Sequence, residues 1–186
     1  MSPRRIFLFS GHMIDSPQRE EPRFPPDAEP IARAAIERKL DELGAGPQDL
    51  AVASGASGGD LLFVESALAR NLPVEMYLPF DEAAFMAASV NAAGAPWPQR
   101  FGSAAARSAL HLMPQERGPL PEGDDPYEQN NLWMLEAASR FGADRVEFIC
   151  LWNGKEGDGP GGAQHLWKEV ERQGGRAHWL NTTLLW

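Results

Sequence analysis

Hydrophobic residues recur along this chain in short continuous runs that alternate with segments of helical spacing. The runs of strand length are Arg5–Ser10, Leu50–Ala53, Pro73–Leu78, Leu110–Met113, Val146–Trp152 and Arg176–Leu180. The first is almost uninterrupted in apolar residues, which is typical of a strand covered on both faces. The pattern therefore predicts six strands.

Apolar positions spaced three and four residues apart predict helices between these runs. The expected helices run from Asp27 or Glu29 to Gly44, from Asp60 to Arg70, within Pro79–Val90, over Tyr127–Phe141 and from Ala163 to Gln173. Helical spacing fails at Ala92–Pro98, a cluster of breaking residues, and Pro114–Pro126 reads as a surface loop.

Strands that alternate with helices through short connections favour parallel βαβ units. We therefore expect an α/β fold, a Rossmann-like three-layer α/β/α arrangement with a mainly parallel sheet, in a single domain spanning residues 1–186. In such sheets, ligands bind outside the carboxyl ends of the strands, where the strand order changes direction.

The most informative segment, Val52–Glu65, combines a strand end, a glycine-rich turn and a helix start. Gly55, Gly58 and Gly59 permit positive φ and close approach of the backbone. Together with Ser57, the turn would present backbone N–H groups and the positive end of a helix dipole to an anion. A second interpretation stays open, in which the glycines only allow a tight turn. Their spacing matches neither a P-loop nor G-x-G-x-x-G.

Two further glycine-containing loops follow predicted strands. Gly11 and His12 lie in the first, and the second is Asn153–Gly162. Because the carboxyl ends of parallel strands lie at one edge, we expect all three loops to share a rim. The second loop adds candidate ligand-binding residues directly before a helix, namely Asp158, Gly159, Gly161 and Gly162. A merely flexible connection is the alternative.

Several side chains near these loops are suited to chemistry. His12 follows a strand end and could donate to a phosphate or act as an acid or base, or be an ordinary loop histidine. Asp60 is suited to accept from a ribose hydroxyl or to ligate Mg²⁺, with a helix N-cap as the structural alternative. Glu65 is placed either near a ribose or in a structural role. Arg23 could close over an anion from the first loop.

A base would need hydrogen-bonding or stacking partners. Asn131 and its neighbour Asn130 open a predicted helix, where an amide could read a base edge or cap the helix. Trp97, Trp133 and Trp152 are candidates for stacking, and the spacing of Trp133 also fits a core position.

Composition narrows the partners. The net charge of −9 disfavours binding to nucleic acid, whose affinity comes from clustered Lys and Arg. The single cysteine, Cys150, and the lack of H-x-x-x-H spacing give no disulfide framework and no zinc site. Mg²⁺ held together with a bound polyphosphate is the one cofactor these residues suggest. The apolar run before Gly11 is too short for a signal or a membrane span, so we expect a cytoplasmic protein without membrane contact.

Two motifs of the chain resemble a known family. The sequence S-G-A-S-G-G-D at Ser54–Asp60 with Glu65, and the later G-D-G-P-G-G, look like the SLOG superfamily. This Rossmann-like fold is shared by the DNA-processing protein A and the "lonely guy" phosphoribohydrolases. The resemblance implies a nucleotide or nucleotide-derived ligand over the strand ends, and it suggests a homodimer.

The chain departs from the hydrolase branch of that superfamily. The motif P-G-G-x-G-T-x-x-E is known there, whereas Ala163, Gln164 and His165 follow Pro-Gly-Gly here. The resemblance is therefore closer to a branch that binds an effector, and sensing of a nucleotide-like small molecule is the expected function. A nucleotide N-glycosidase that releases a base, with Asp60, Glu65 or His12 as catalytic candidates, and a protein interaction module without a ligand are the alternatives.

Overall fold

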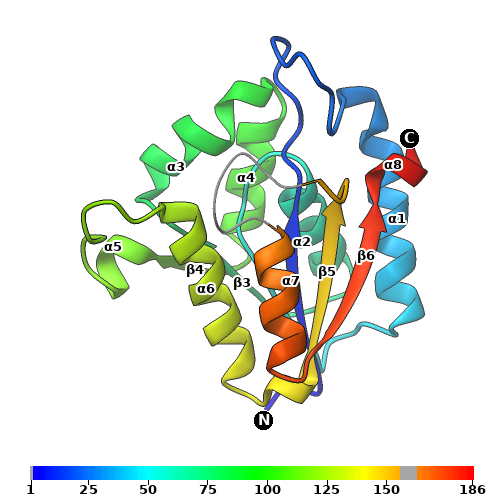
Figure 1. The fold of residues 1–186 in the computed structure, drawn as a ribbon, viewed down its shortest axis with the longest axis vertical. Coiled ribbons are helices and arrows are strands. Elements are labelled where there is room, and N and C mark those ends of the chain that lie inside the picture. Colours follow the sequence, from blue (N-terminus) through cyan, green and yellow to red (C-terminus); the bar gives the residue numbers. More distant parts are fainter. Residues whose placement is uncertain (1, 156–162) are drawn as a thin grey trace.

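A computed structural model describes residues 2–155 and 163–186 of the chain (Figure 1). Its strands are β1 (Ile6–Gly11), β2 (Leu50–Ala53), β3 (Val74–Leu78), β4 (Ala109–Leu112), β5 (Val146–Trp152) and β6 (Arg176–Asn181). They form one six-stranded sheet in the order β4-β3-β2-β1-β5-β6, with every neighbouring pair parallel. The expected α/β class is confirmed.

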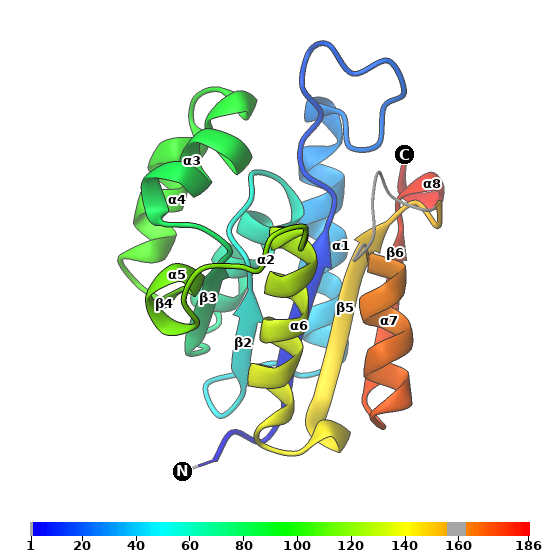
Figure 2. The same cartoon turned by 60° about the vertical axis from the view of Figure 1, so that its left-hand side comes forward.

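Helices cover both faces of the sheet, as Figure 2 shows. They are α1 (Glu29–Glu42), α2 (Gly59–Ala69), α3 (Glu82–Ser89), α4 (Trp97–Ala105), α5 (Met113–Glu116), α6 (Pro126–Ser139), α7 (Ala163–Arg172) and α8 (Thr182–Leu185). Residues of α1, α2 and α4 share one buried cluster with the sheet, and residues of α6 and α7 share the other. The arrangement is thus three layers, α/β/α.

Strand β1 illustrates why the strands read as continuous apolar runs. Phe7 and Phe9 belong to the cluster with α1 and α2, while Ile6 and Leu8 belong to the cluster with α6 and α7. All four side chains are fully buried. Because successive side chains point to opposite faces of a strand, a strand covered on both sides must be apolar throughout.

The chain order changes direction beside β1. From β1 the chain moves outward through β2, β3 and β4, then returns across the sheet to β5 on the other side of β1. In this pairing, Gly11 at the end of β1 lies opposite Leu151, one residue before the end of β5. The topological switch point therefore lies between β1 and β5.

Two predicted non-helical segments contain helices. Helix α4 begins at Trp97 inside the expected breaker cluster, and α5 begins at Met113, the last residue of the expected strand Leu110–Met113, and continues into the expected loop. Both have a proline in the first turn, where its missing N–H costs no helical hydrogen bond. In α4 the burial of Trp97 and Phe101 then fixes one face against the core.

None of the helices within residues 2–155 and 163–186 combines the length and apolarity needed to cross a membrane.

Candidate functional site at the carboxyl ends of the strands

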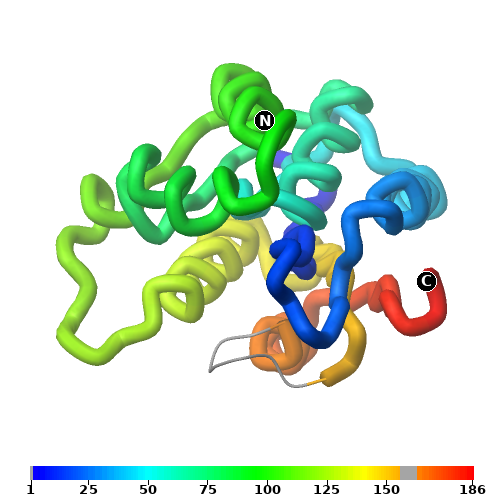
Figure 3. Tube along the Cα trace, turned by 90° about the horizontal axis from the view of Figure 1, so that it is seen from above, coloured from blue at the N-terminus to red at the C-terminus, as the bar shows by residue number. Residues whose placement is uncertain are grey.

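The loops after β1 and β5 meet at the switch point. The N–H of His12 donates to the carbonyl oxygen of Leu151 at 3.0 Å, and the N–H of Asn153 donates to Nε2 of the His12 ring at 3.2 Å. Figure 3 looks down on this end of the sheet, where the blue loop after β1 passes close to the end of β5. The predicted meeting of the first and last loops is thus seen for their described parts.

The environment of His12 favours a neutral ring. Burial lowers the pKa of His12 to about 4, and the positive charges of Arg23 and Arg19 act in the same direction, against the bond from Asn153 and the charge of Asp15. Because Nε2 accepts from Asn153, the neutral ring carries its proton on Nδ1. Both arginines belong to the loop after β1, and their positive charges lower the pKa of the His12 ring.

The loop after β1 is fixed at its base. The carboxylate of Asp15 accepts from the N–H groups of Arg23 and Phe24, both at 2.8 Å, and its other oxygen lies 3.4 Å from Nε of Arg19. Phe24 is fully buried and stacks on Trp186 at 5.1 Å between ring centroids. The backbone of Arg23 is therefore positioned by contacts on both sides of the loop.

The glycine-rich turn is covered by the segment that follows β1. The N–H of Gly59 donates to the carbonyl oxygen of His12 at 2.9 Å, and the N–H of Ile14 donates to that of Ser57 at 3.0 Å. The N–H of Ser57 in turn donates to the carbonyl oxygen of Ser89 at 2.9 Å. The expectation that Ser57 and Gly59 present free N–H groups therefore does not hold in this conformation, because both groups are satisfied inside the protein.

Packing explains the three glycines of this turn. A Cβ on Gly58 would lie 2.5 Å from the backbone nitrogen of Ile14, and φ at Gly58 is +112°. A Cβ on Gly59 would lie 3.3 Å from the Cα of Gly11, and one on Gly55 would lie 2.7 Å from the Cε of Met76. The structural interpretation of the turn accounts for these residues, and their contact with a ligand stays a prediction.

Asp60 is a buried carboxyl group at the same edge. Its side chain lies in the first turn of α2, and it is 8 % exposed. Burial raises the pKa of Asp60 to about 7, although the N–H groups of Ala56 and Gly11 favour its charged form. The N-cap of α2 is Gly58, so Asp60 does not have the capping role considered as its structural alternative.

Glu65 lies away from the strand ends in an ion-pair cluster between helices. Arg100 of α4 donates to both of its carboxylate oxygens, at 2.7 and 2.8 Å, and Arg33 of α1 donates to Oε2 at 2.6 Å. Arg100 also pairs with Glu29 at 2.9 Å. These contacts support the structural alternative for Glu65 over a catalytic or ribose-binding role.

The two asparagines of α6 differ in setting. Asn130 is 2 % exposed and its Nδ2 donates to the carbonyl oxygen of Tyr77 at 3.0 Å, so it ties α6 to β3. Asn131 is half-buried. Neither caps the helix, because the side chain of Asp125 accepts from the N–H of Glu128 at 2.8 Å. Reading of a base by Asn131 stays a prediction.

The three tryptophans predicted for stacking differ in burial and in their place in the fold. Trp97 is 4 % exposed beneath the guanidinium of Arg100, which lies 3.9 Å from its ring centroid. Trp133 is 6 % exposed and packs edge-on against Tyr77. Only Trp152 of these three lies at a strand end on the candidate rim.

Four predicted ligand-binding residues, Asp158, Gly159, Gly161 and Gly162, lie outside the described residues. Among the residues that are described, no cluster of His, Cys, Asp or Glu is arranged to hold a metal ion. The structure singles out Asn153, which was expected only as the first residue of the predicted loop Asn153–Gly162, and it adds Ser89, a partner of the turn that sequence reasoning missed. The position of Asn153 directly after the most apolar strand was the available signal for the first, whereas Ser89 had none.

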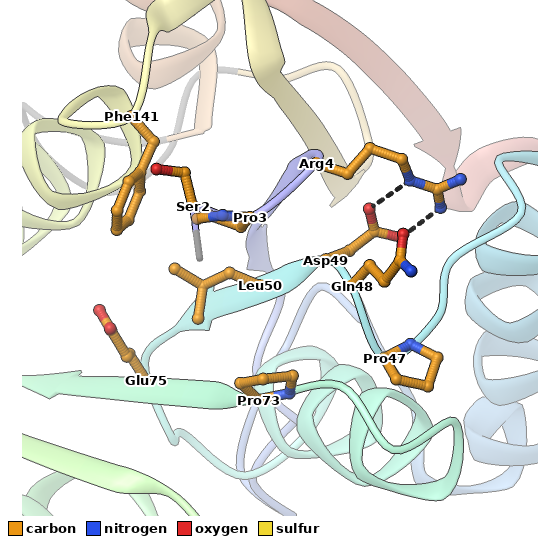
Figure 4. A pocket seen from close by; sticks show the side chains of 10 residues that line it. All are labelled: Ser2, Pro3, Arg4, Pro47, Gln48, Asp49, Leu50, Pro73, Glu75 and Phe141. Atoms are coloured by element: carbon orange, nitrogen blue, oxygen red, sulfur yellow. Dashed lines mark hydrogen bonds and ion pairs between the residues drawn. The ribbon is translucent and has the colours of Figure 1, made fainter.

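A separate cavity lies at the opposite edge of the sheet (Figure 4). It has a volume of about 410 Å³ and is lined by Ser2, Pro3, Arg4, Pro47, Gln48, Asp49, Leu50, Pro73, Glu75 and Phe141. Its two clearest polar groups satisfy each other, because Arg4 donates to both carboxylate oxygens of Asp49, at 2.9 and 2.7 Å. This edge holds the amino ends of the strands, where ligands of open α/β sheets do not usually bind.

Comparisons with known proteins give structural likenesses alone. No protein-family model and no curated protein matches the chain. TM1055, a target of the Northeast Structural Genomics Consortium, is 13 % identical with a TM-score of 0.42, over 96 % of this chain and 94 % of its own. DNA processing protein A from Helicobacter pylori, described with a single-stranded DNA binding mode, is 12 % identical with a TM-score of 0.40, over 98 % of this chain and 78 % of its own.

At these identities and TM-scores the two structural likenesses support no statement about function. The family resemblance described from the sequence rests on the two loop motifs of this chain alone.

Proposed function

We propose that this protein senses an anionic, nucleotide-derived small molecule by binding it at the carboxyl ends of β1 and β5. The observation that carries the proposal is the junction of His12 and Asn153 at the switch point of the sheet. Ligands of doubly wound sheets bind at this place, outside the carboxyl ends of the strands where the strand order changes direction.

The charge around His12 favours an anion. Arg23 and Arg19 act on the ring through their positive charge, against the negative charge of Asp15, which pairs with Arg19. With Nε2 occupied by Asn153, the Nδ1–H of the neutral ring is available to donate to a phosphate or ribose oxygen. The overall charge of −9 argues against a long nucleic acid as the ligand, so a small phosphorylated molecule fits better.

The glycine turn supports the site from behind in this proposal. It holds the backbone of residues 12–14 through hydrogen bonds at Ser57 and Gly59. Gly11 and His12 then face the ligand. Direct contact of the turn with phosphate would require the segment after β1 to move.

Asp60 favours a second candidate, a nucleotide N-glycosidase. A buried carboxyl group whose pKa is raised to about 7 holds a proton near neutral pH, as a general acid must. Its place beside Gly11 puts it at the same strand end as His12. The hydrolase would need this group to reach the leaving base or an attacking water molecule.

A thermal-shift screen tests the proposal. Mononucleotides, dinucleotides, cyclic nucleotides and ADP-ribose are offered with and without Mg²⁺, and each incubated ligand is then separated by chromatography to detect a released base. Stabilisation without base release supports sensing, and base release supports the N-glycosidase. A chain that responds to none of them contradicts both and favours an interaction module without a ligand.

Variants of the loop after β1 locate the site. Arg23→Ala should weaken binding of the stabilising ligand, since a positive charge near His12 is lost. Arg172→Ala, an exposed arginine at the end of α7, is the matched control and should leave binding unchanged. Equal effects of the two changes would point to general charge rather than to this site.

A further inference from the structure

Two tryptophans lie together in the carboxyl-terminal halves of β5 and β6. Trp152 is the last residue of β5, and Trp179 lies opposite Cys150 on β6. Their ring centroids are 5.9 Å apart at an interplanar angle of 41°. This pair lies on the side of the switch point away from the glycine turn, because β6 follows β5 in the sheet order.

Both indole N–H groups are satisfied by backbone. Nε1 of Trp179 donates to the carbonyl oxygen of Trp152 at 2.8 Å, and Nε1 of Trp152 donates to that of Lys155 at 2.7 Å. Trp179 is nevertheless 46 % exposed. The indole N–H of Trp179 is therefore bonded inside the protein while its apolar ring is exposed to solvent. Solvation alone would favour the opposite arrangement, with the ring buried and the N–H exposed to water.

The loop after β5 connects this pair to the switch point. Asn153 donates its N–H to His12, and its neighbour Gly154 passes against the Trp179 ring. A Cβ on Gly154 would lie 3.0 Å from Cζ2 of Trp179, and φ at Gly154 is +79°, so glycine permits this close approach. One short segment thus contacts both the proposed anion site and the exposed ring.

The span between the two sites suits a nucleotide. Strands β1 and β6 are separated by β5, so they lie two interstrand spacings apart, roughly 10 Å, and Trp179 lies opposite Cys150, one position before the Gly11–Leu151 pair. A mononucleotide can reach that far from its phosphate to its base. An aromatic ring whose face is open and whose rotation is restrained is what base stacking requires.

We propose that Trp179, held in place by Trp152, is the platform on which the base of the bound ligand stacks. This inference rests on the proposed function, with the phosphate or ribose at His12. It makes the ligand one that contains an aromatic base rather than a sugar phosphate alone.

The other tryptophans that the structure describes do not offer such a surface. Trp97 is covered by Arg100, Trp133 is buried against Tyr77, and Trp186 stacks on Phe24. Trp167 packs edge-on against Phe148. Within residues 2–155 and 163–186, Trp179 is thus the tryptophan with the most open ring.

A pair of ligands separates base recognition from anion recognition. Calorimetry compares the nucleotide that best stabilises the wild-type chain with ribose 5-phosphate, which has the same anionic end and no base. Trp179→Leu should weaken nucleotide binding roughly tenfold and leave ribose 5-phosphate unchanged, since stacking on one aromatic ring is lost. Trp179→Phe keeps a ring and should restore most of the nucleotide affinity.

Controls keep the two proposals distinct. Leu184→Ala removes another exposed apolar side chain, on α8, and should change neither affinity. His12→Ala should weaken both ligands alike, because it acts at the anionic end. Failure of the wild-type chain to bind either ligand would overturn the proposed function and the platform together.

Three results would overturn the platform alone. These are an unchanged nucleotide affinity in Trp179→Leu, an equal loss for both ligands in that variant, and a base-dependent loss that appears in Asn131→Ala instead. Quenching of indole fluorescence by the nucleotide gives an independent reading, since it should disappear in Trp179→Leu and persist in Leu184→Ala.

Discussion

The ring nitrogen Nε2 of His12 accepts a hydrogen bond of 3.2 Å from the backbone N–H of Asn153, which joins two loops that are 141 residues apart in sequence. The bond crosses the boundary between β1 and β5, where the chain changes direction in the sheet. An imidazole in this place connects the two halves of the fold at the switch point of the sheet, where we propose that the ligand binds. Changes to His12 should therefore alter binding and stability together.

Two replacements of His12 test the hydrogen bond that its Nε2 accepts from Asn153. His12→Gln retains an acceptor for the N–H of Asn153, whereas His12→Ala leaves that N–H without its partner. We expect His12→Ala to cost about 1–2 kcal/mol of unfolding free energy and His12→Gln to cost less, because a half-buried donor loses its acceptor. Urea denaturation measures this, and equal costs for the two variants would show that the bond to Asn153 contributes little.

Acid should destabilise the protein through His12. Its pKa is about 4 in the folded state and 6.5 without perturbation, so below pH 6.5 the unfolded chain binds a proton that the folded chain does not. The stability that this histidine contributes is thus complete above pH 6.5 and is lost as the pH falls toward 4. The upper limit of the unfolding free energy lost through this pKa shift is about 3 kcal/mol. The advantage of wild type over His12→Gln in unfolding free energy should fall from pH 7 to pH 4 and reverse in sign, because the glutamine does not titrate.

Asp60 should have the opposite pH dependence. Its pKa is about 7 in the folded state and 3.8 without perturbation, so between these values the unfolded chain releases a proton that the folded chain retains. Stability is therefore lost as the pH rises from about 4 to 7, by an upper limit of about 4 kcal/mol. Asp60→Asn, which keeps an acceptor and has no charge to bury, should raise the melting temperature at pH 8 and change it little at pH 4. A variant that lowers the melting temperature at both pH values would contradict a protonated, desolvated Asp60.

The sequence predicted the sheet well because its signals are local. The run Val146–Trp152 and the run Leu50–Ala53 have the bounds of β5 and β2, since β2 is apolar throughout and β5 is apolar except for the buried Glu147. Helix α4 was missed because Trp97 stands between two prolines, and only the packing of Trp97 and Phe101 against the core reveals it.

The candidate site was harder to predict because its contacts are distant in sequence. Gly58 looks like a phosphate-binding glycine until the backbone of Ile14, 44 residues earlier, is placed against it. Glu65 looks available until Arg100, 35 residues later, pairs with it. Sequence spacing gives the loop that carries a residue, and it does not give which other loop covers it.

Glu65 should matter for stability and not for binding. Glu65→Gln removes the charge that Arg33 and Arg100 share, and leaves the partly buried Arg100 paired only with Glu29. We expect a loss of about 1–2 kcal/mol in unfolding free energy, between the values for exposed and for buried ion pairs. Ligand affinity, measured by calorimetry on the folded variant, should be unchanged. A loss of affinity in the folded variant would return Glu65 to the list of catalytic candidates.

Two glycine-to-alanine changes test why glycine occurs in the turn. Gly58→Ala places a Cβ 2.5 Å from the backbone nitrogen of Ile14 at a φ of +112°, so the segment after β1 must move away. We expect a loss of about 2 kcal/mol or more in unfolding free energy, from the strained conformation and the broken contacts. Gly102→Ala in α4 is the control, because a Cβ there meets no atom within 4 Å and a helical alanine should stabilise by about 0.5–1 kcal/mol. If Gly58→Ala retains wild-type stability but loses ligand affinity, the turn contacts the ligand directly and the phosphate-binding interpretation of its glycines is restored.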